Sequence, residues 1–316
     1  MQTVYPMLMK PVHTHSVWGG ETLARLRGEE GPGYGTSWEI SAHPHAESLV
    51  ANGPLAGQAL AKVIADRPKE MLGLGGPDRM LRTAFLDALE PLSVQVHPTE
   101  DYARERGDHG KTESWYIVAA DAGATLVAGV TTLDAERLRA AAEDGTIEEY
   151  LVHHSVSSGD FVHIPAGMVH ALGGGIVALE VGTNSDTTYR VFDYGRTDGF
   201  GSPRELHLDD AFAVADLSLR TEVVHAQRSP SPSAASSTRI LVSCPDYTVE
   251  VVELVDGISL NTKGGFDCLT VVSGTCKVMG MGDDVVLKTC DSVFVPASTG
   301  TYGLRGTGRL IRGYAR

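Results

Sequence analysis

Four side chains in the first 170 residues have the types and spacing that could hold a divalent metal ion. Two of them lie in the run SVQVHP, where an extended backbone would place Ser93, Gln95 and His97 on one face and two valines on the other. Three polar side chains opposite valines are typical of a strand that lines a wet cavity. The same alternation is routine in strands with one face in solvent, so this run alone does not distinguish a cavity-lining strand from a solvent-facing one.

The other two candidates lie in separate runs further along the chain. In KTESWY, Glu113 shares a face with Lys111 and Trp115 if the run is extended. In HIPAGMVHAL, a Pro-Ala-Gly turn would deliver His170 to the start of a short strand. Taken singly, charges at the start of a strand are usually solvated, and a lone histidine is more often satisfied within the core than a metal ligand.

Together the four residues are a more specific signal than any one of them. They would supply one amide oxygen, one carboxylate and two imidazoles, a mixed set that suits zinc or another first-row divalent ion. Fewer than six protein ligands would leave a position for water or substrate, which is typical of a catalytic site. Ligand type favours zinc but leaves Mn²⁺, Fe²⁺ and Co²⁺ open.

Two arginines in the segment TTYRVFDYGR could recognise an anionic group. The guanidinium groups of Arg190 and Arg196 match the geometry of phosphate oxygens. The alternative is that they pair with acidic residues of the same mixed-sign region, namely Asp186, Asp193 and Asp198. No serine or cysteine nucleophile signature and no phosphate-cradling glycine loop is present in the sequence.

The elements that must position these residues are mostly short strands. Runs rich in β-branched and aromatic residues recur through both halves of the chain, at the spacing of sandwiches and barrels. Two helices are expected in the first half. One covers 57–72 and is interrupted at Pro68, and the other covers 133–154, so that His153 and His154 would end it.

A weak internal repeat predicts two copies of one jelly-roll unit. A stretch that opens at Glu113 closes with FVHIPAGMVHAL, and a stretch that opens at Asp267 closes with SVFVPASTGTYGL. The alignment sets His170 against Thr301, and no residue of the second copy replaces His97. The predicted fold class is therefore mainly β, with two jelly-roll barrels, a small helical insertion in the first, and chemistry in the first alone.

Composition divides the chain at a Ser/Pro/Ala-rich stretch, 227–238, that suits a linker. The 316 residues carry a formal net charge of −14, which argues against a nucleic-acid partner because phosphate-tracking surfaces are basic. All four cysteines follow the linker without the CxxC spacing of a zinc knuckle. The sequence has no long apolar run for a membrane span and no signal-peptide pattern, so we expect a cytoplasmic protein with reduced thiols.

Several blocks of the sequence resemble the type I mannose-6-phosphate isomerases, in the short bacterial form of this family of cupin proteins. The match runs through most of residues 8–207, and the order and spacing of the blocks are the family's. The blocks are Ser16-VWGG, Ser37-WEISAHP, Phe85-LDALEPLSVQVHP, His109-GKTESWYIV, Gly159-DFVHIPAGMVHALGGG, Asn184-SDTTYRVFDYGR and Arg204-ELH. Beyond about residue 238 the chain resembles the family's second cupin only in outline.

The resemblance implies that the four candidate ligands hold one catalytic zinc ion per chain: Gln95, His97, Glu113 and His170. It further implies that Arg190 is the catalytic arginine, with Lys111 also in a catalytic position. Ser93 and Glu180 would line the substrate pocket, and Arg196 is a candidate phosphate contact. The resemblance also places a catalytic cupin domain with helical insertions at 1–227 and a degenerate cupin domain without metal ligands at 239–316.

The activity implied is the interconversion of mannose 6-phosphate and fructose 6-phosphate through a cis-enediol. The base could be Lys111, Glu180 or a hydroxide held by the metal. Two departures from the family, Ala84 for a frequent lysine and Gly182-Thr183 for frequent glutamines, leave the preferred sugar phosphate open. The competing hypotheses are a cupin isomerase of another aldose phosphate and a sugar-phosphate-binding cupin without turnover. The sequence does not indicate the oligomeric state.

Overall fold

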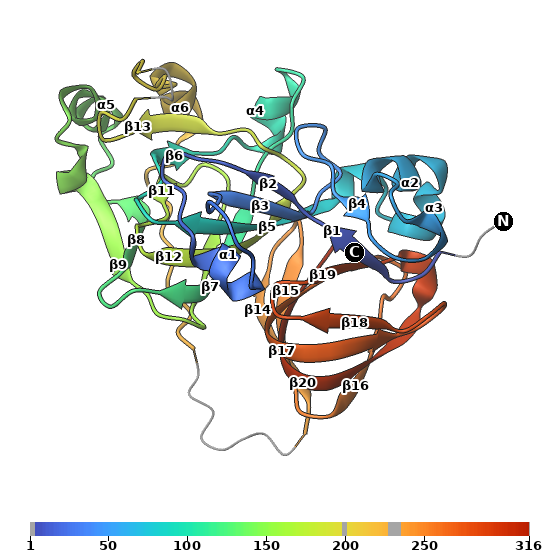
Figure 1. The fold of residues 1–316 in the computed structure, drawn as a ribbon. Helices are drawn as coiled ribbons and strands as arrows, with labels where there is room; N and C mark the ends of the chain where they lie inside the picture. The colour runs from blue at the N-terminus through green and yellow to red at the C-terminus, as the bar shows by residue number, and fades with distance from the viewer. Residues whose placement is uncertain (1–3, 198–200, 227–234, 316) are drawn as a thin grey trace.

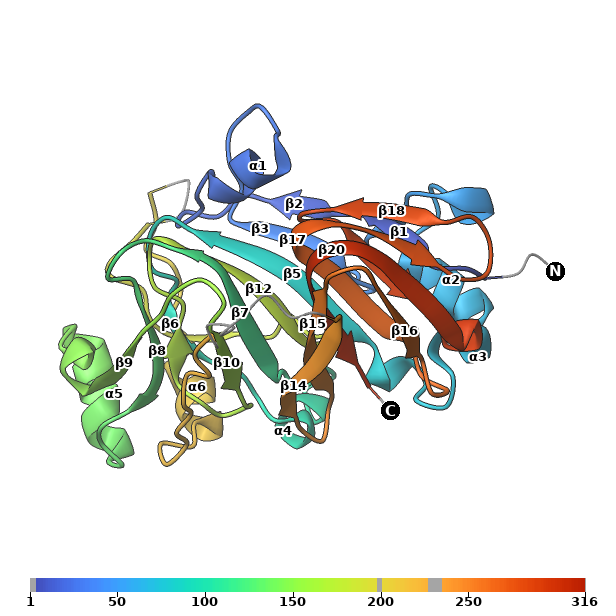
Figure 2. The same ribbon diagram turned by 90° about the horizontal axis from the view of Figure 1, so that it is seen from below.

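The structure is a computed structural model that describes residues 4–197, 201–226 and 235–315. Its described strands form three sheets, which are arranged as two barrels that lie side by side (Figures 1 and 2). The prediction of a mainly β fold with two jelly-roll barrels is confirmed. Most of the expected linker, 227–234, lies outside the described residues.

The first barrel consists of two antiparallel sheets. The six-stranded sheet has the order β10 (Phe161–Ile164), β7 (Glu113–Ala120), β12 (Ile176–Thr183), β5 (Leu81–Ala88), β3 (Thr36–Ile40) and β2 (Val12–Thr14). The five-stranded sheet has the order β13 (Tyr189–Phe192), β6 (Val94–Val96), β11 (His170–Ala171), β8 (Thr125–Val130) and β9 (Leu151–Ser155). Each predicted site residue belongs to one of these strands or to an adjoining loop.

The second barrel is a single nine-stranded sheet that also takes in two strands from near the N-terminus. Its path is β14 (Ser237–Ser243), β15 (Thr248–Leu254), β20 (Thr301–Tyr314), β17 (Asp267–Met279), β19 (Ser292–Val295), β1 (Met7–Lys10) and β4 (Leu49–Val50). Two further strands pair with this path, β16 (Gly257–Asn261) with β20 and β18 (Val285–Lys288) with β17. The expected unit 1–227 therefore contributes two strands to the sheet of the expected unit 239–316.

In the described part of the chain, six short helices lie around the first barrel and beside the second (Figure 1): α1 (Thr22–Arg27), α2 (Leu60–Asp66), α3 (Pro68–Leu72), α4 (Glu100–Arg104), α5 (Ala135–Asp144) and α6 (Leu208–Val214). Single 3-10 turns cover Gly53–Leu55, Pro77–Arg79, Ile147–Tyr150 and Ala297–Thr299. The helix expected at 57–72 is confirmed from Leu60 onward as α2 and α3, with the expected break at Pro68. Among the residues described, no helix has the length and apolarity needed to cross a membrane.

The second expected helix, 133–154, was predicted too long. Helix α5 ends at Gly145, which adopts the left-handed conformation (φ +83°) that glycine allows at a helix C-terminus. After a 3-10 turn the chain enters β9, which pairs with β8, so His153 and His154 lie in a strand and do not end a helix. Pairing with a neighbouring strand thus overrides the helical pattern beyond Gly145.

The cores of the first barrel explain how β6 is oriented. Val94 and Val96 are fully buried in a cluster that includes Leu138 of α5 and Ala211 of α6. Because side chains alternate along a strand, Gln95 must point to the opposite side, into the barrel. The alternation predicted for this run is confirmed, and it directs the polar face of β6 toward the site described next.

Candidate active site

Three of the four predicted ligands meet at one buried point of the first barrel. His97 follows β6, Glu113 opens β7 and His170 opens β11. The Nε2 atoms of His97 and His170 lie 3.3 Å from Oε2 and Oε1 of Glu113, respectively. Two ligand atoms about 2.0–2.1 Å from a tetrahedral ion lie about 3.3 Å apart, so this spacing fits one metal ion.

Hydrogen bonds fix the orientation of both imidazoles. The Nδ1–H group of His97 donates to the carbonyl oxygen of Thr187 at 2.8 Å, and that of His170 donates to the carbonyl oxygen of Met168 at 2.8 Å. With the proton on Nδ1 in a neutral ring, Nε2 carries the lone pair that a metal requires. Each histidine is therefore held in the form and direction of a ligand.

The polar atoms at the centre of this cluster lack partners that would satisfy them. Among the described residues, His97 Nε2 and both carboxylate oxygens of Glu113 are buried without a hydrogen bond. Lys111 Nζ lies 2.7 Å from Glu113 Oε2, a close ion pair but not in hydrogen-bonding geometry. Because unsatisfied buried polar atoms are costly, this donor set fits a bound cation.

The protonation states of His97 and Glu113 also favour the binding of a cation. Burial and the neighbouring Lys111 ammonium lower the pKa of His97 to about 3, so its imidazole is neutral at pH 7. Burial alone would raise the pKa of Glu113, but Lys111 and His97 hold this pKa well below its usual range. The site thus offers a carboxylate beside a neutral imidazole, and the contact between them is not an ion pair.

Gln95, the fourth predicted ligand, lies beside the other three. It is paired with His170 across β6 and β11, and its Nε2 atom lies 3.3 Å from Nε2 of His170. The hydroxyl of Ser93 donates to Gln95 Oε1 at 3.3 Å. Half a turn of the amide group exchanges its oxygen and nitrogen, so Gln95 can present an oxygen ligand to an ion at this point.

A cavity of about 430 Å³ adjoins the cluster, and most of the predicted site residues line it. The predicted residues in its wall are Ser93, Gln95, Lys111, Glu113, Glu180 and Arg190. The other polar and aromatic residues that line it include Trp18, Trp38, Arg82, Asp186 and Arg204. Ala84, one of the departures from the family pattern, also forms part of the wall.

Lys111 and Glu180 lie next to each other on this wall. Lys111 Nζ is 3.8 Å from Glu180 Oε1, and both side chains are buried. The loop that carries Lys111 is held by Thr183, which accepts a hydrogen bond from the Thr112 amide at 3.2 Å and donates one to the Gly110 carbonyl at 3.0 Å. The second departure from the family pattern therefore supports the segment that presents Lys111 to the cavity.

The two predicted arginines are placed differently. Arg190 lines the cavity, where its Nη1 donates to the Glu205 carbonyl at 2.6 Å; burial and the charge of Arg204 lower its pKa. Arg196 is absent from the cavity lining, because its guanidinium is held by the Asp193 carboxylate and by the Pro91 carbonyl at 2.6 Å. For Arg196, pairing with Asp193 is the alternative that the structure favours. Asp198, another partner considered, lies outside the described residues.

Arg204 and Arg82 are cavity residues that the sequence did not single out. Arg204 lines the cavity, with its Nη1 atom 3.1–3.2 Å from the oxygens of Asp193. Its place in the block RELH was the one available signal. Arg82 is buried on β5 and gave no signal in the sequence, because its partners lie about 100 residues further along the chain.

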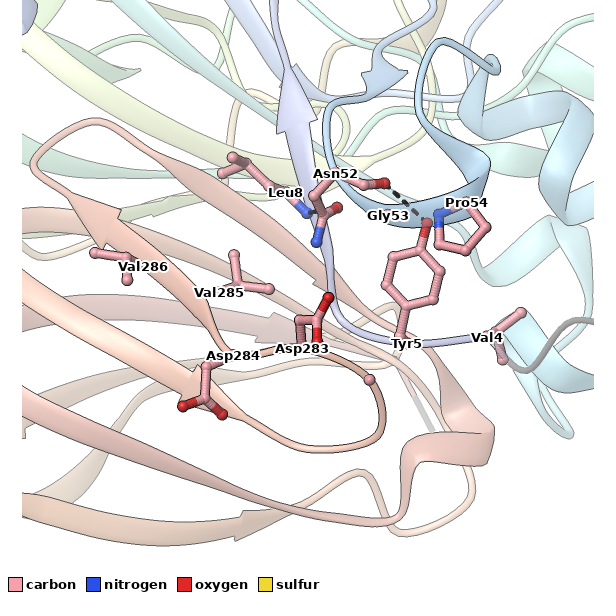
Figure 3. A pocket seen from close by; sticks show the side chains of 11 residues that line it. Val4, Tyr5, Leu8, Asn52, Gly53, Pro54, Asp283, Asp284, Val285 and Val286 are labelled. Carbon is pink, nitrogen blue, oxygen red and sulfur yellow. Dashed lines mark hydrogen bonds between the residues drawn. The ribbon is translucent and has the colours of Figure 1, made fainter.

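A second cavity, of about 480 Å³, lies between β1 and the hairpin of β17 and β18 (Figure 3). Tyr5 reaches across it and donates a hydrogen bond to the Asn52 carbonyl at 2.8 Å. Its described lining contains the carboxylates of Asp283 and Asp284 and no lysine, arginine or histidine. Lys277 lies outside this lining and pairs with Asp284 at 3.3 Å, so the lining itself offers two carboxylates and no cation. Carboxylates repel a phosphate, so this cavity does not fit an anionic ligand.

Comparison with known proteins agrees with the geometry of the first cavity. The family model for the catalytic domain of type I phosphomannose isomerase matches residues 7–134, and that for the cupin domain of mannose-6-phosphate isomerase matches residues 237–315. A Bacillus subtilis protein named mannose-6-phosphate isomerase ManA is 34% identical, over 98% of both chains. A Streptococcus mutans mannose-6-phosphate isomerase is 32% identical, also over 98% of both chains.

The same relationship is found in three dimensions. The crystal structure of the mannose 6-phosphate isomerase from Bacillus subtilis superposes with a TM-score of 0.90 at 32% identity, covering 99% of this chain and 100% of the other. The similarity in sequence and in fold therefore extends along nearly the full length of the chain. The chain belongs to the type I mannose-6-phosphate isomerase family, whose members are aldose-ketose isomerases.

Proposed function

We propose that the protein interconverts mannose 6-phosphate and fructose 6-phosphate, with one zinc ion bound by Gln95, His97, Glu113 and His170. The observation that carries this proposal is the buried cluster of unsatisfied ligand atoms, which adjoins a cavity walled by Lys111, Glu180 and Arg190. Zinc fits the mixed nitrogen and oxygen donors and the tetrahedral spacing of the cluster. When bound, it would act as a Lewis acid on the carbonyl and hydroxyl oxygens of the sugar.

The cavity residues supply the proton transfer that isomerisation requires. A proton leaves C2 of the aldose while the C1 carbonyl oxygen takes one up, which gives a cis-enediol; a proton is then returned to C1 while the C2 hydroxyl loses its proton, which gives the ketose. Lys111 and Glu180, which lie 3.8 Å apart on the wall, are the groups that would accept and return this proton. Arg190 would stabilise the negative charge that develops on the enediol oxygens.

The phosphate group needs a cation away from the metal cluster. We propose Arg204, with Arg190, in place of the Arg196 expected from the sequence. Both arginines pair with Asp193, but Arg204 lines the cavity, whereas Arg196 is absent from its lining and also donates to the Pro91 carbonyl. Ser93 would contact a sugar hydroxyl, since its own hydroxyl lies beside Gln95 in the cavity wall.

The experiment that tests this proposal is a coupled isomerase assay before and after chelation, with metal added back. We expect interconversion of mannose 6-phosphate and fructose 6-phosphate to be lost on chelation and restored by zinc. Elemental analysis of the purified protein should give one metal ion per chain. Turnover that persists after complete metal removal would overturn the metal dependence, and no turnover with any divalent ion would favour a sugar-phosphate-binding protein without activity.

A second candidate is an isomerase of another aldose phosphate. It is favoured by Ala84, which leaves part of the cavity wall without a long side chain, and by the small Gly182. A panel of aldose phosphates compared by kcat/KM distinguishes the two. A higher value for any other sugar phosphate than for mannose 6-phosphate would favour this second candidate.

We also propose residues 1–227 as the catalytic unit and 239–316 as a unit without a metal site. This division is supported by the lining of the cavity, all of which comes from residues before 227. A cytoplasmic location is proposed as well. It is supported by the four cysteines, none of which is paired in a disulfide.

A further inference from the structure

Arg82 is a buried arginine in the cavity wall for which the proposed mechanism has no role. Its side chain is 4% exposed and lies between two carboxylates. One guanidinium nitrogen contacts Glu180 Oε1 closely, and Nη1 donates to Asp186 Oδ1 at 3.2 Å. The guanidinium also stacks on the ring of Trp38, 4.4 Å from its centroid. These three contacts, with Glu180, Asp186 and Trp38, fix the side chain in one position.

Arg82 has room for this position because its neighbours are small. On β5 the next residue of the same face is Ala84, and across the strand pair Arg82 lies opposite Gly182 of β12. Neither neighbour has a side chain that reaches the guanidinium. The two departures from the family pattern, at residues 84 and 182, therefore both adjoin Arg82.

Charges alternate from the metal cluster to the rim of the cavity. Glu113 contacts Lys111 at 2.7 Å, and Lys111 lies 3.8 Å from Glu180. Glu180 contacts Arg82, which in turn bonds to Asp186. At the rim, Asp186 Oδ2 lies 2.8 Å from Nδ1 of His45, whose side chain is 73% exposed. Arg82 is the central cation of this series.

We propose that Arg82 is a positioning residue for the isomerase reaction: it holds the Glu180 carboxylate in place and apart from Lys111. The inference rests on the proposed function and adds a residue to it. Glu180 Oε1 faces two cations, Arg82 in close contact and Lys111 at the longer distance. Without Arg82, Glu180 would either approach Lys111 or take up a proton, since a buried carboxylate needs a partner.

Either response would disturb the groups that transfer the proton. An approach of Glu180 would draw the Lys111 ammonium away from Glu113, and a protonated Glu180 could not act as a base. The ion pairs of Glu113, Glu180 and Asp186 would also involve one lysine or arginine, Lys111, in place of two. A displacement of about 1 Å in such a group costs about 100-fold in rate.

The test compares four variants with the wild type: Arg82→Met, Arg82→Lys, Glu180→Gln and the double variant Arg82→Met/Glu180→Gln. We expect Arg82→Met to lose about 100-fold in kcat with a smaller change in KM, and Arg82→Lys to recover part of the loss. Because Arg82 acts through Glu180, the double variant should be no slower than Glu180→Gln alone. Metal content should stay at one ion per chain throughout.

Arg312→Met is the matched control, since Arg312 is a buried, doubly paired arginine of the second barrel. Arg312→Met should lower thermal stability without lowering kcat. A loss of kcat in Arg82→Met but not in Arg312→Met then comes from lost positioning and not from the loss of a buried ion pair as such. If the kcat losses of the two single variants multiplied in the double variant, or if Arg82→Met had an unchanged kcat, the positioning role of Arg82 would be overturned. The proposed function of the protein would be unaffected by either result. A wild type without turnover on any sugar phosphate would overturn both this role and the proposed function.

Discussion

Glu113 and Asp267 occupy equivalent positions in the two barrels. Glu113 opens β7 and lies opposite Ile164 of β10, and Asp267 opens β17 and lies opposite Val295 of β19. A proline follows each partner residue, at the turn that leads into the next strand. The internal repeat expected from the sequence is therefore confirmed in the register of the strands, and it aligns a candidate metal ligand with a buried aspartate.

A guanidinium satisfies this aspartate in the second barrel. Arg312 Nη2 donates to Asp267 Oδ2 at 2.8 Å, and its Nη1 donates to Glu250 Oε2 at 3.1 Å. Arg312 lies opposite Leu269 on β17, as Glu180 lies opposite the corresponding residue of β7. In the first barrel the equivalent carboxylate, Glu113, has Lys111 at 2.7 Å but accepts no hydrogen bond, so it remains available to a bound cation. In the second, a residue of the chain supplies the positive charge.

The first prediction concerns this internal cation. Arg312→Met would leave the buried carboxylates of Asp267 and Glu250 without their cation and is expected to cost about 3–5 kcal/mol of the free energy of unfolding. Urea denaturation measures this loss. The triple variant Arg312→Met/Asp267→Asn/Glu250→Gln should recover most of the stability, because no unpaired charge remains. A fully stable Arg312→Met would contradict the role given to this cluster.

The second prediction concerns the metal cluster. His97→Ala and His170→Ala should each lose both bound metal and activity, because each removes a ligand and leaves an unsatisfied Glu113 oxygen. Elemental analysis and the coupled assay measure the two losses. His153→Ala is the control, since His153 pairs with Glu148 on the surface at 3.0 Å and should have no effect. Full zinc occupancy in either ligand variant would contradict the ligand set.

The third prediction concerns pH and Glu39, a buried carboxylate of β3 that accepts hydrogen bonds from Arg27 and Ser37. Burial raises the pKa of Glu39 from 4.5 to about 7, with Arg27 only partly opposing this shift. Between these two values the folded state binds more protons than the unfolded chain, so the contribution of Glu39 to the free energy of unfolding is full below pH 4.5 and is lost as pH rises to about 7. Relative to Glu39→Gln, the wild type should lose on the order of 3 kcal/mol between about pH 4 and about pH 8.

Urea denaturation of both proteins across this pH range tests the sign of the effect. Other titrating groups are common to wild type and variant, so they cancel in the difference between the two. A difference that grows in favour of the wild type as pH rises would show that the Arg27 contact, and not burial, dominates the titration of Glu39.

The two-residue periodicity of strands was enough to predict which residues of β6 face the site. The alternation of Ser93, Gln95 and His97 against two buried valines was right because side-chain direction in a strand repeats every two residues. The order of strands around a barrel then brings His170 and Glu113 to the same point. The ligand cluster was predictable because each member lies in or directly beside a regular strand.

The arginines were harder to predict because their directions are set by contacts far away in the sequence. Arg196 lies in a loop, where the nearby Asp193 competes with the cavity for its guanidinium. The position of Arg82 depends on Gly182, its partner across the β5–β12 pair, and on Glu180 beside it. Neither cross-strand partner can be inferred from the sequence around Arg82.

The last prediction concerns Gly182, where β12 passes close to the residue that opens β7. A Cβ atom at residue 182 would lie 2.6 Å from the Thr112 carbonyl oxygen and 3.2 Å from Cα of Glu113. Gly182→Ala must therefore push β12 away from the backbone of Thr112 and Glu113. The nearest atoms belong to the backbone, so no flexible side chain can move aside to make room. Since Thr112 lies between Lys111 and Glu113, the shift should weaken metal binding and lower kcat, measured by metal titration and the coupled assay. Gly257→Ala in β16, where the nearest atom lies 3.3 Å away, is the control and should leave both unchanged. If Gly182→Ala bound metal with normal affinity, the cluster would tolerate movement of β7. That result would contradict the view that metal binding depends on the observed spacing of the ligand atoms.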